Sequence, residues 1–230
     1  MKRLAGGIAV VCGMAFAGNA AAVTLIDDFS GAVQQTSDAV AEGTPTASSS
    51  GVVNPSGSPF TTREITTSKT GGATNASVTA GVNSFDLEFF TISSLPTVSS
   101  ITSLLYTGSG VDLSGGGLND VFIVNVFDSD VAFDIDVTFT DGVNTDTETI
   151  SVTGPLSNDT ITFSFADFGG VDFSSIAGLS LVIASASALD AQFTLLTTID
   201  STPPSAVPLP ATALLLMAGL GGLAMARRRV

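Results

Sequence analysis

Carboxylates are the side chains in this sequence with the clearest capacity for chemistry. The chain has no histidine and a single cysteine, Cys12, which excludes Ser-His-Asp triads and the usual zinc sites. Two placed acids are enough for glycoside hydrolysis, and Asp134 and Asp136 are the obvious pair. Both are expected on the polar face of a strand, where solvated carboxylates are usual. We therefore predict no catalytic residue and no enzyme, and keep carboxylate-based hydrolysis as a distant alternative. Lys69 is no better as a base, because we expect it in a polar loop.

Calcium is the ion for which the sequence offers the most ligands, since Ca²⁺ prefers hard oxygen donors. No acidic group has the spacing of an EF-hand loop, and the glycine-rich segment 114–120 matches a calcium-binding repeat poorly. The alternative is that these residues are turn and edge aspartates on a solvated surface. The candidate ligands are Asp27, Asp28, Asp128, Asp130, Asp141, Asn144, Asp146 and Asp190.

Glycan binding is a third possibility, and the aromatic content limits how it could work. Sugar-binding modules usually stack pyranose rings on exposed aromatic side chains. This chain has no tryptophan, one tyrosine (Tyr106) and 15 phenylalanines. Most of the phenylalanines fall at alternating positions, which predicts that they belong to the core. A polar, hydrogen-bonded sugar site remains open.

The charge balance excludes some partners. All 21 acidic residues lie between Asp27 and Asp200, and only Arg63 and Lys69 among the basic residues do, which gives that segment a formal charge of −19 (2 − 21). The negative electrostatic potential of this segment repels nucleic acid and anionic lipid headgroups. It favours cations and helps to keep an exported protein soluble. We predict no nucleic-acid partner.

Residues 23–200 are predicted to form one all-β domain, an antiparallel β-sandwich of the jelly-roll type. In the clearest strand, 131–140, apolar and polar residues alternate, which puts apolar side chains on one face. A stretch rich in Ser, Thr, Gly and Pro, residues 37–59, is predicted to be a long polar loop. Many short strands separated by turn residues indicate a sandwich. Further strands are expected at 84–92, 121–127, 147–152, 160–165, 179–184 and 191–198.

The N-terminus has the three parts of a cleavable signal peptide. Lys2 and Arg3 precede an uncharged apolar run, and the small residues Ala20 and Ala22 follow it. We predict a signal helix within residues 1–22, cleavage by signal peptidase after Ala22, and a mature chain that begins at Val23. Cys12 would leave with the signal, so disulfides would not stabilise the mature protein.

The C-terminus has three parts as well. A stiff linker at 201–206 precedes the motif Val207, Pro208, Leu209, Pro210 and Ala211. An uncharged apolar run, 211–226, is predicted to form a transmembrane helix. It is 16 residues long, about 24 Å of helix. The basic residues Arg227, Arg228 and Arg229 end the chain and would hold it on the cytoplasmic side.

This tail resembles the VPLPA variant of the PEP-CTERM sorting signal, which an exosortase, a membrane-embedded cysteine transpeptidase, processes. The resemblance implies recognition at residues 207–211, a transient membrane segment and a basic stop. The other reading is an ordinary anchor that is never cut.

The domain itself also resembles known proteins. The segments 25–30, 62–65, 117–120, 165–168 and 171–176 are similar to those of secreted, C-terminally sorted bacterial proteins. The last third resembles the jelly-roll sandwich of carbohydrate-binding modules. In such modules a structural calcium often ties the first strand to the last, and the resemblance implies that Asp28 and Asp190 are its ligands. No other cofactor is implied.

Taken together, these features predict a protein exported across the inner membrane of a Gram-negative bacterium to the cell surface or the extracellular matrix. Before processing, its C-terminal helix would hold it in the membrane. The sandwich would have a non-catalytic structural or adhesive role, and the alternative is a glycan-binding module. The expected partners are signal peptidase, an exosortase-type transpeptidase and extracellular polysaccharide.

The tail allows a direct test. We expect that replacing Pro208 and Pro210 with alanine leaves full-length protein in the inner membrane, because proline fixes the extended backbone that suits a protease cleft. Fractionation and intact-mass analysis of protein from the native host would measure this. Release of the variant as efficient as that of the parent would mean that the tail is only an anchor.

Overall fold

The structure is a computed structural model that describes residues 23–39, 48–73, 76–82 and 88–202. The predicted signal peptide and the sorting tail, 207–230, lie outside these residues, and so do both predicted terminal helices. Within the described ranges, no helix is long and apolar enough to cross a membrane. Export and sorting therefore stay predictions.

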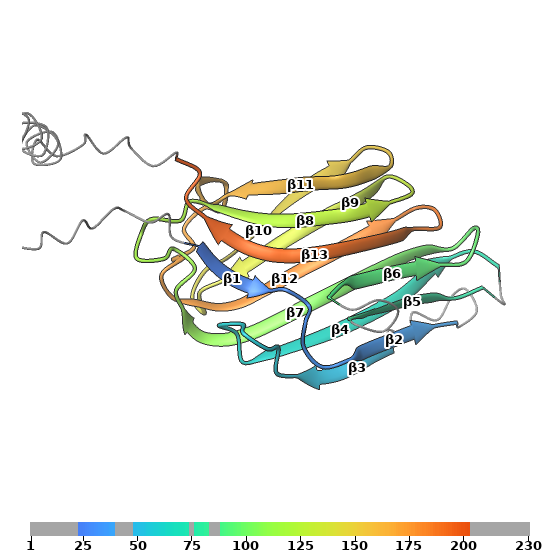
Figure 1. Ribbon diagram of the computed structural model, residues 1–230, viewed down its shortest axis with the longest axis horizontal. Coiled ribbons are helices and arrows are strands. Elements are labelled where there is room, and N and C mark those ends of the chain that lie inside the picture. Colours follow the sequence, from blue (N-terminus) through green and yellow to red (C-terminus); the bar gives the residue numbers. More distant parts are fainter. Residues whose placement is uncertain (1–22, 40–47, 74–75, 83–87, 203–230) are drawn as a thin grey trace, which may run out of the picture. The chain divides into compact units, whose positions relative to one another are not determined.

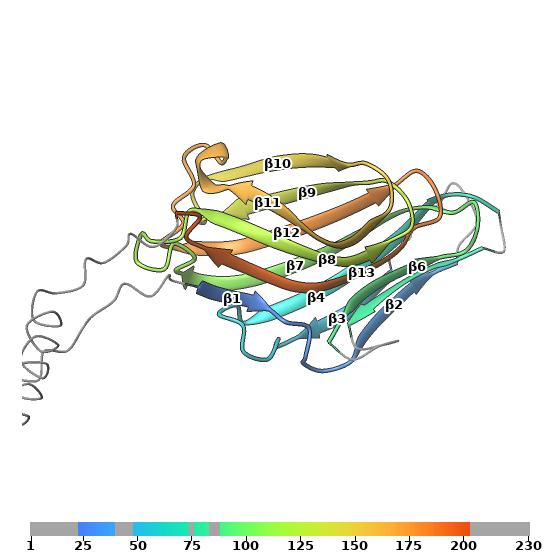
Figure 2. The same cartoon turned by 45° about the horizontal axis from the view of Figure 1, so that its top comes forward.

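The described chain forms two antiparallel sheets that pack face to face, as Figures 1 and 2 show. Sheet A has seven strands in the order β11-β8-β13-β6-β5-β2, and β1 also pairs with β13. Sheet B has six strands in the order β10-β9-β12-β7-β4-β3. The strands of sheet A are β1 (Val23–Asp27), β2 (Gln34–Asp38), β5 (Val78–Val82), β6 (Phe90–Ser94), β8 (Val121–Ser129), β11 (Leu156–Ser164) and β13 (Asp190–Ile199). Those of sheet B are β3 (Ser48–Val53), β4 (Thr62–Gly71), β7 (Ser99–Val111), β9 (Phe133–Thr140), β10 (Thr145–Val152) and β12 (Ile176–Ser185).

The predicted β-sandwich is confirmed, and the alternation in β9 shows why it forms. Phe133, Ile135, Val137 and Phe139 are all buried, and the residues between them face outward. The β9–β10 hairpin turns at Gly142, whose φ of 89° is in the left-handed region that glycine adopts without strain. A 3₁₀ turn at Phe165–Asp167 is the one helical element in the described residues.

The predicted polar loop at 37–59 is wrong in part, because Ser48–Val53 forms β3, an edge strand paired with β4. An edge strand can form on backbone hydrogen bonds to one neighbour, so the alternation of apolar residues that marks a core strand is not required. The prediction that Lys69 lies in a loop is also wrong. Lys69 lies in β4, it is 7% exposed, and its backbone N–H donates to the Asp38 carboxylate.

Aromatic rings fill one part of the space between the sheets. Phe139 of β9 contacts Phe122 of β8 at a centroid distance of 5.5 Å, and Phe168 and Phe173 at 5.0 Å each. Phe168 and Phe173 come from the connection between β11 and β12. The prediction that most phenylalanines form the core is confirmed for these residues.

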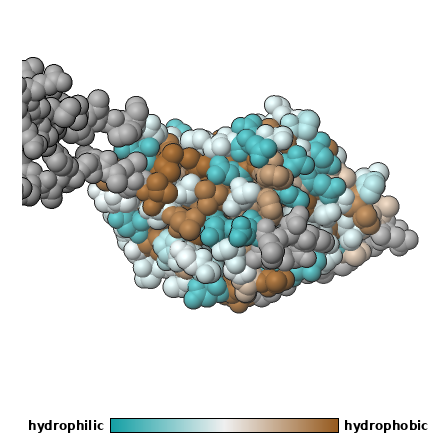
Figure 3. All heavy atoms as spheres, in the orientation of Figure 1, coloured by the Kyte–Doolittle hydropathy of each residue, from teal (hydrophilic) through white to brown (hydrophobic). Residues whose placement is uncertain are grey.

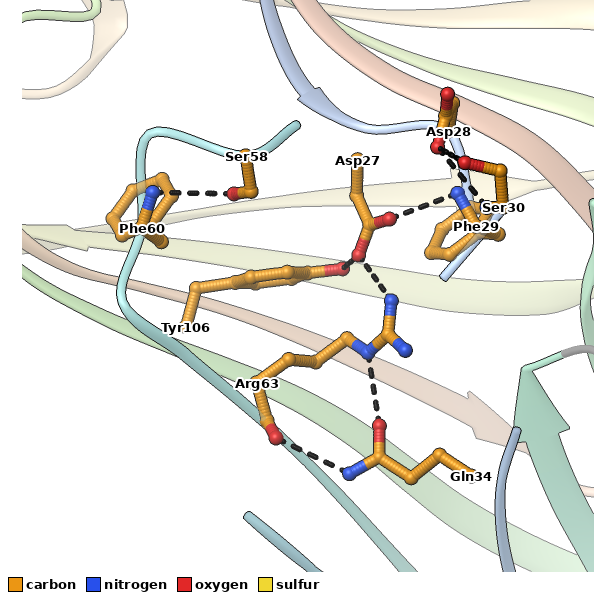
Figure 4. Close-up of polar contacts among 9 residues, drawn as sticks. All are labelled: Asp27, Asp28, Phe29, Ser30, Gln34, Ser58, Phe60, Arg63 and Tyr106. Carbon is orange, nitrogen blue, oxygen red and sulfur yellow. Dashed lines mark hydrogen bonds and ion pairs between the residues drawn. The ribbon is translucent and has the colours of Figure 1, made fainter. Parts of the chain in front are cut away.

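A buried ion pair connects the two sheets (Figure 4). Arg63 of β4 donates from Nη1 to Asp27 Oδ2 of β1 at 2.5 Å, and both side chains are at most 1% exposed. The Tyr106 hydroxyl of β7 donates to the same oxygen at 2.8 Å. Arg63 Nε donates to the side-chain oxygen of Gln34 in β2 at 2.9 Å, and the Gln34 amide donates back to the Arg63 carbonyl at 3.1 Å. Each sheet therefore supplies two members of this group.

The end of the sandwich where β13 finishes is closed by Asn119 and Asp120. The Asn119 amide donates to Thr198 Oγ1 of β13 at 2.9 Å and to Thr24 Oγ1 of β1 at 3.2 Å. The Asp120 carboxylate accepts hydrogen bonds from the side chain and the backbone N–H of Ser201, at 2.5 and 2.6 Å. These bonds lower the pKa of Asp120. The first strand and the last therefore start and end at a shared, hydrogen-bonded point.

The ion pair predicts a large stability effect at one aspartate and a small one at its neighbour. We expect Asp27→Asn to lower the free energy of unfolding by about 3–5 kcal/mol, because it leaves the Arg63 charge buried without its counter-charge. Urea unfolding measures this. Asp28→Asn is the control: this side chain only bonds Ser30 within a turn, and its loss should cost about 1 kcal/mol. Equal losses in the two variants would contradict the role given to the ion pair.

Tyr106 predicts an alkaline limit to stability. Burial, and then the Asp27 charge, raise the pKa of Tyr106 well above its ordinary value of 10.0. The folded state therefore holds this proton more tightly than the unfolded state, and its contribution to stability is complete below about pH 10 and is lost as the pH rises further. Because Tyr106 is the sole tyrosine, tyrosinate absorbance reports this site alone, and it should rise together with unfolding measured by circular dichroism. Ionisation near pH 10 in a chain that is still folded would contradict the burial argument.

Candidate functional site

The predicted acidic pair lies on the outer face of sheet B. Asp134 is exposed and borders a shallow hollow between the ends of β7, β9 and β12. Asp136 accepts a hydrogen bond from Thr149 of the neighbouring strand at 2.6 Å. Both carboxylates therefore lie where the alternation predicted, on a solvated face.

Asp141 and Asp146 cap backbone groups in the structure. Asp141 accepts hydrogen bonds from the backbone N–H groups of Asn144 (2.6 Å), Val143 (2.8 Å) and Asp172 (2.9 Å). These donors, Asn144 first, hold the pKa of Asp141 far below its ordinary value. Asp146 accepts from the Gly169 N–H at 2.5 Å. The two residues therefore serve as turn caps that attach the β9–β10 hairpin to the β11–β12 connection, and calcium binding by them stays a prediction.

Asp28 and Asp190 do not share one site in the structure. Asp27, next to Asp28, pairs with Leu196, which is about 20 Å along β13 from Asp190 at ~3.3 Å per residue. Burial raises the pKa of Asp28, but hydrogen bonds from Ser30 outweigh it and the pKa is lowered. Asp190 accepts from the Ser94 backbone N–H. No group of three or more acidic or other metal-ligating side chains occurs in the described ranges, and calcium binding at either aspartate stays a prediction.

A different group of residues lies together on the outer face of sheet A. Its centre is a pair of phenylalanine rings: Phe127 of β8 and Phe89, just before β6, have centroids 5.2 Å apart at an interplanar angle of 63°. Phe127 is 41% exposed and Phe89 is half-buried. Strand β13 runs between β8 and β6, so the ring pair spans it. An aromatic pair on the outside of a sandwich is unusual in this chain, because the other described rings pack in or against the core.

Two β-bulges produce this arrangement. On β8 the register with β13 shifts between the Asp128–Gln192 and Val126–Phe193 pairs, so Phe127 is an extra residue. On β13 it shifts again, so Thr194 has no partner opposite it. A bulge changes which side chains face outward. As a result Phe127 and Asp128, although adjacent in sequence, are both exposed.

Open hollows lie on both sides of the ring pair. One, of about 240 Å³, is bordered by residues of β6, β8 and β13, among them Ser93, Asp128, Asp190 and Gln192. The other, of about 280 Å³, lies between β8, β11 and β13 and is bordered by Phe127 and by Asn125, Asp159, Thr160 and Thr194. Asn125 accepts a hydrogen bond from Thr160 at 3.0 Å, which leaves its NH₂ group to donate. Figure 3 shows the side of the molecule on which sheet A lies, where both hydrophobic and hydrophilic residues reach the surface.

We call these residues the β8–β13 face: Phe89, Ser93, Asn125, Phe127, Asp128, Asp159, Thr160, Asp190, Gln192 and Thr194. It can make a hydrophobic contact at its centre and hydrogen bonds to both sides. Of its members, sequence reasoning named Asp128 and Asp190, both as calcium ligands. It missed Phe127, although a signal was present: Phe127 shares its parity with the polar Asn125, and Phe122, Val124 and Val126 form the buried face.

Neither a protein-family model nor a curated protein sequence matches the chain. Solved structures with similar folds include CtCBM11, with a TM-score of 0.43 at 14% identity over 80% of this chain and 99% of that one. The family 11 carbohydrate-binding module from Clostridium thermocellum, in complex with a β-1,3-1,4-mixed-linked tetrasaccharide, gives 0.39 at 15% identity over 79% and 97%. The enzymatically active domain of bacteriophage CBA120 tailspike protein 4 gives 0.36 at 16% identity over 59% and 19%.

Proposed function

We propose that the sandwich is a non-catalytic glycan-binding module and that the β8–β13 face is its binding site. The observation that carries the proposal is the ring pair of the half-buried Phe89 and the exposed Phe127, with a hydrogen-bonding hollow on each side. A sugar ring has an apolar face of C–H groups and a rim of hydroxyls, so it needs this combination of surfaces.

The side chains around the rings match the rim of a sugar. Gln192 and Asn125 can donate and accept, Thr194 and Thr160 offer hydroxyls, and Asp128 accepts. They come from neighbouring strands and their backbones are fixed by the sheet. A site built on strands loses little conformational entropy on binding, which favours a rigid, shallow contact with a sugar chain.

The extent of the face favours a chain of sugars over a single ring. The hollows and the ring pair together span four neighbouring strands, β6, β13, β8 and β11. At ~4.8 Å between strands this is about 14 Å. We therefore propose that the ligand is a polysaccharide that crosses the strands, with one sugar over the rings and others in the hollows.

The location of this activity is also a proposal. The signal-like residues 1–22 and the motif at 207–211 support export and C-terminal sorting of the domain. A glycan-binding module carried there would attach the cell surface or its matrix to extracellular polysaccharide. The adhesive role predicted from the sequence and the binding role are then two descriptions of one function.

Phe127 gives the sharpest test. We expect Phe127→Ala to weaken binding of the full-length protein to its polysaccharide by about tenfold, because the contact area of the ring is worth about 1.5 kcal/mol. A glycan array identifies the polysaccharide, and isothermal titration measures the affinity. Ile101→Ala on the outer face of sheet B is the matched control, since Ile101 is also 41% exposed.

The control should bind as the parent does. If the parent binds no glycan, or if Phe127→Ala and Ile101→Ala bind equally well, the proposed site is wrong. Release of shorter products from a bound polysaccharide would instead favour the hydrolase alternative.

A further inference from the structure

The basic side chains of the domain are both buried, and this restricts the charge of any ligand. Arg63 and Lys69 are the only basic residues between Val23 and Thr202. Arg63 is 0% exposed and paired with Asp27, and Lys69 is 7% exposed. The Lys69 ammonium group donates to the carbonyl of Ala73. The surface of this domain therefore presents carboxylates and no exposed cation.

The charged side chains of the β8–β13 face are all carboxylates. Asp128 and Asp190 border the hollow on one side of the ring pair, and Asp159 borders the hollow on the other. All three are exposed. Arg63 pairs with Asp27 inside the sandwich, away from these three carboxylates. The face is thus negative on both sides of its hydrophobic centre.

This arrangement discriminates between sugar polymers. A polymer of uronic acids, or one with sulfate or phosphate groups, would place anions against carboxylates with no cation to offset them, which is a repulsive arrangement. A neutral polymer would meet no such penalty. A polymer whose sugars carry free amines would place ammonium groups against the aspartates and gain attraction in both hollows.

We propose that the ligand of the β8–β13 face is a cationic amino-sugar polymer, a chain of hexosamines whose amino groups are at least partly free of acetyl groups. The ring pair contacts the C–H face of one sugar, and Asp128, Asp190 and Asp159 accept hydrogen bonds from the ammonium groups of its neighbours. The proposal rests on the proposed glycan-binding function and names the class of glycan. The carboxylates beside the ring pair are complementary in charge to such a ligand, and the ring pair offers its hydrophobic contact.

The test compares two ligands that differ only in acetylation. The probes are glucosamine hexaose and N-acetylglucosamine hexaose of the same linkage, titrated against the full-length protein in a mildly acidic, low-salt buffer that keeps the sugar amines protonated. We expect the free-amine hexaose to bind about tenfold more tightly, the size expected for two or three exposed charge contacts. This preference should shrink in 1 M sodium chloride, where the screening length falls to ~3 Å. Oligogalacturonate should show no binding.

Variants then test whether the preference for the free-amine hexaose arises at the β8–β13 face. Asp128→Asn combined with Asp190→Asn should reduce the ratio of the two affinities towards one, because it removes the negative charges that the ammonium groups would contact. The matched control is Asp167→Asn, which removes an exposed carboxylate from the 3₁₀ turn outside the face and should leave the ratio unchanged. A Phe127→Ala variant should weaken both ligands together.

The outcomes separate this inference from the function on which it rests. If another, neutral glycan binds in a Phe127-dependent manner and the free-amine hexaose does not bind better than its acetylated form, the amino-sugar inference is overturned and the glycan-binding function stands. If no glycan of any class binds, both fail. A preference for the free amine that Asp167→Asn reduces as much as the double variant would reflect the overall charge of the protein, and would overturn the assignment to this face.

Discussion

The buried pair of Arg63 and Asp27 is the contact on which the arrangement of the two sheets depends. Apolar contacts are not directional, but a buried charge must lie next to its partner, because separating the two leaves an uncompensated charge in the interior. Arg63 belongs to sheet B and Asp27 to sheet A. Tyr106 also donates to Asp27, and Gln34 accepts from Arg63 Nε, while Arg63 Nη2 is buried without a hydrogen-bond partner among the described residues. Because the mature chain is predicted to have no disulfide, this group is the strongest specific connection between the sheets.

The burial of both basic side chains also means that the exposed charges of the domain have one sign. Both basic residues of the domain, Arg63 and Lys69, are buried in β4, and Arg63 pairs with Asp27. Every exposed ionic group in the described ranges is therefore an acid. The buried ion pair and the proposed preference for cationic glycans thus have one cause: the basic side chains lie inside the domain and most of the acidic ones outside. A chain that placed its arginine on the outside would lose both the connection between the sheets and the uniform sign of the surface.

Strands could be predicted from the sequence where burial of one face imposes an alternation of apolar and polar residues, and could not be predicted where it does not. The alternation in β9, and the runs that became β8, β12 and β13, could be recognised because one face of each strand is buried. The edge strand β3 has one strand neighbour and no such pattern, and it was read as loop. The candidate site could not be predicted in full, because it depends on the register between β8 and β13. The bulges beside Phe127 and Thr194 depend on which residues of β8 and β13 lie opposite each other, and a single sequence does not contain that pairing.

The closure at Ser201 has a mechanical consequence. Beyond that residue the chain continues toward the predicted membrane tail, so a pull on the tail reaches the domain through Ser201, Asp120 and the end of β13. β13 lies inside sheet A between β8 on one side and β1 and β6 on the other. A force along its axis loads those ladders in shear, and many hydrogen bonds share it at once. Because β13 also supplies Gln192 and Thr194 to the β8–β13 face, tension between a held polysaccharide and the cell would run along one strand from one attachment point to the other.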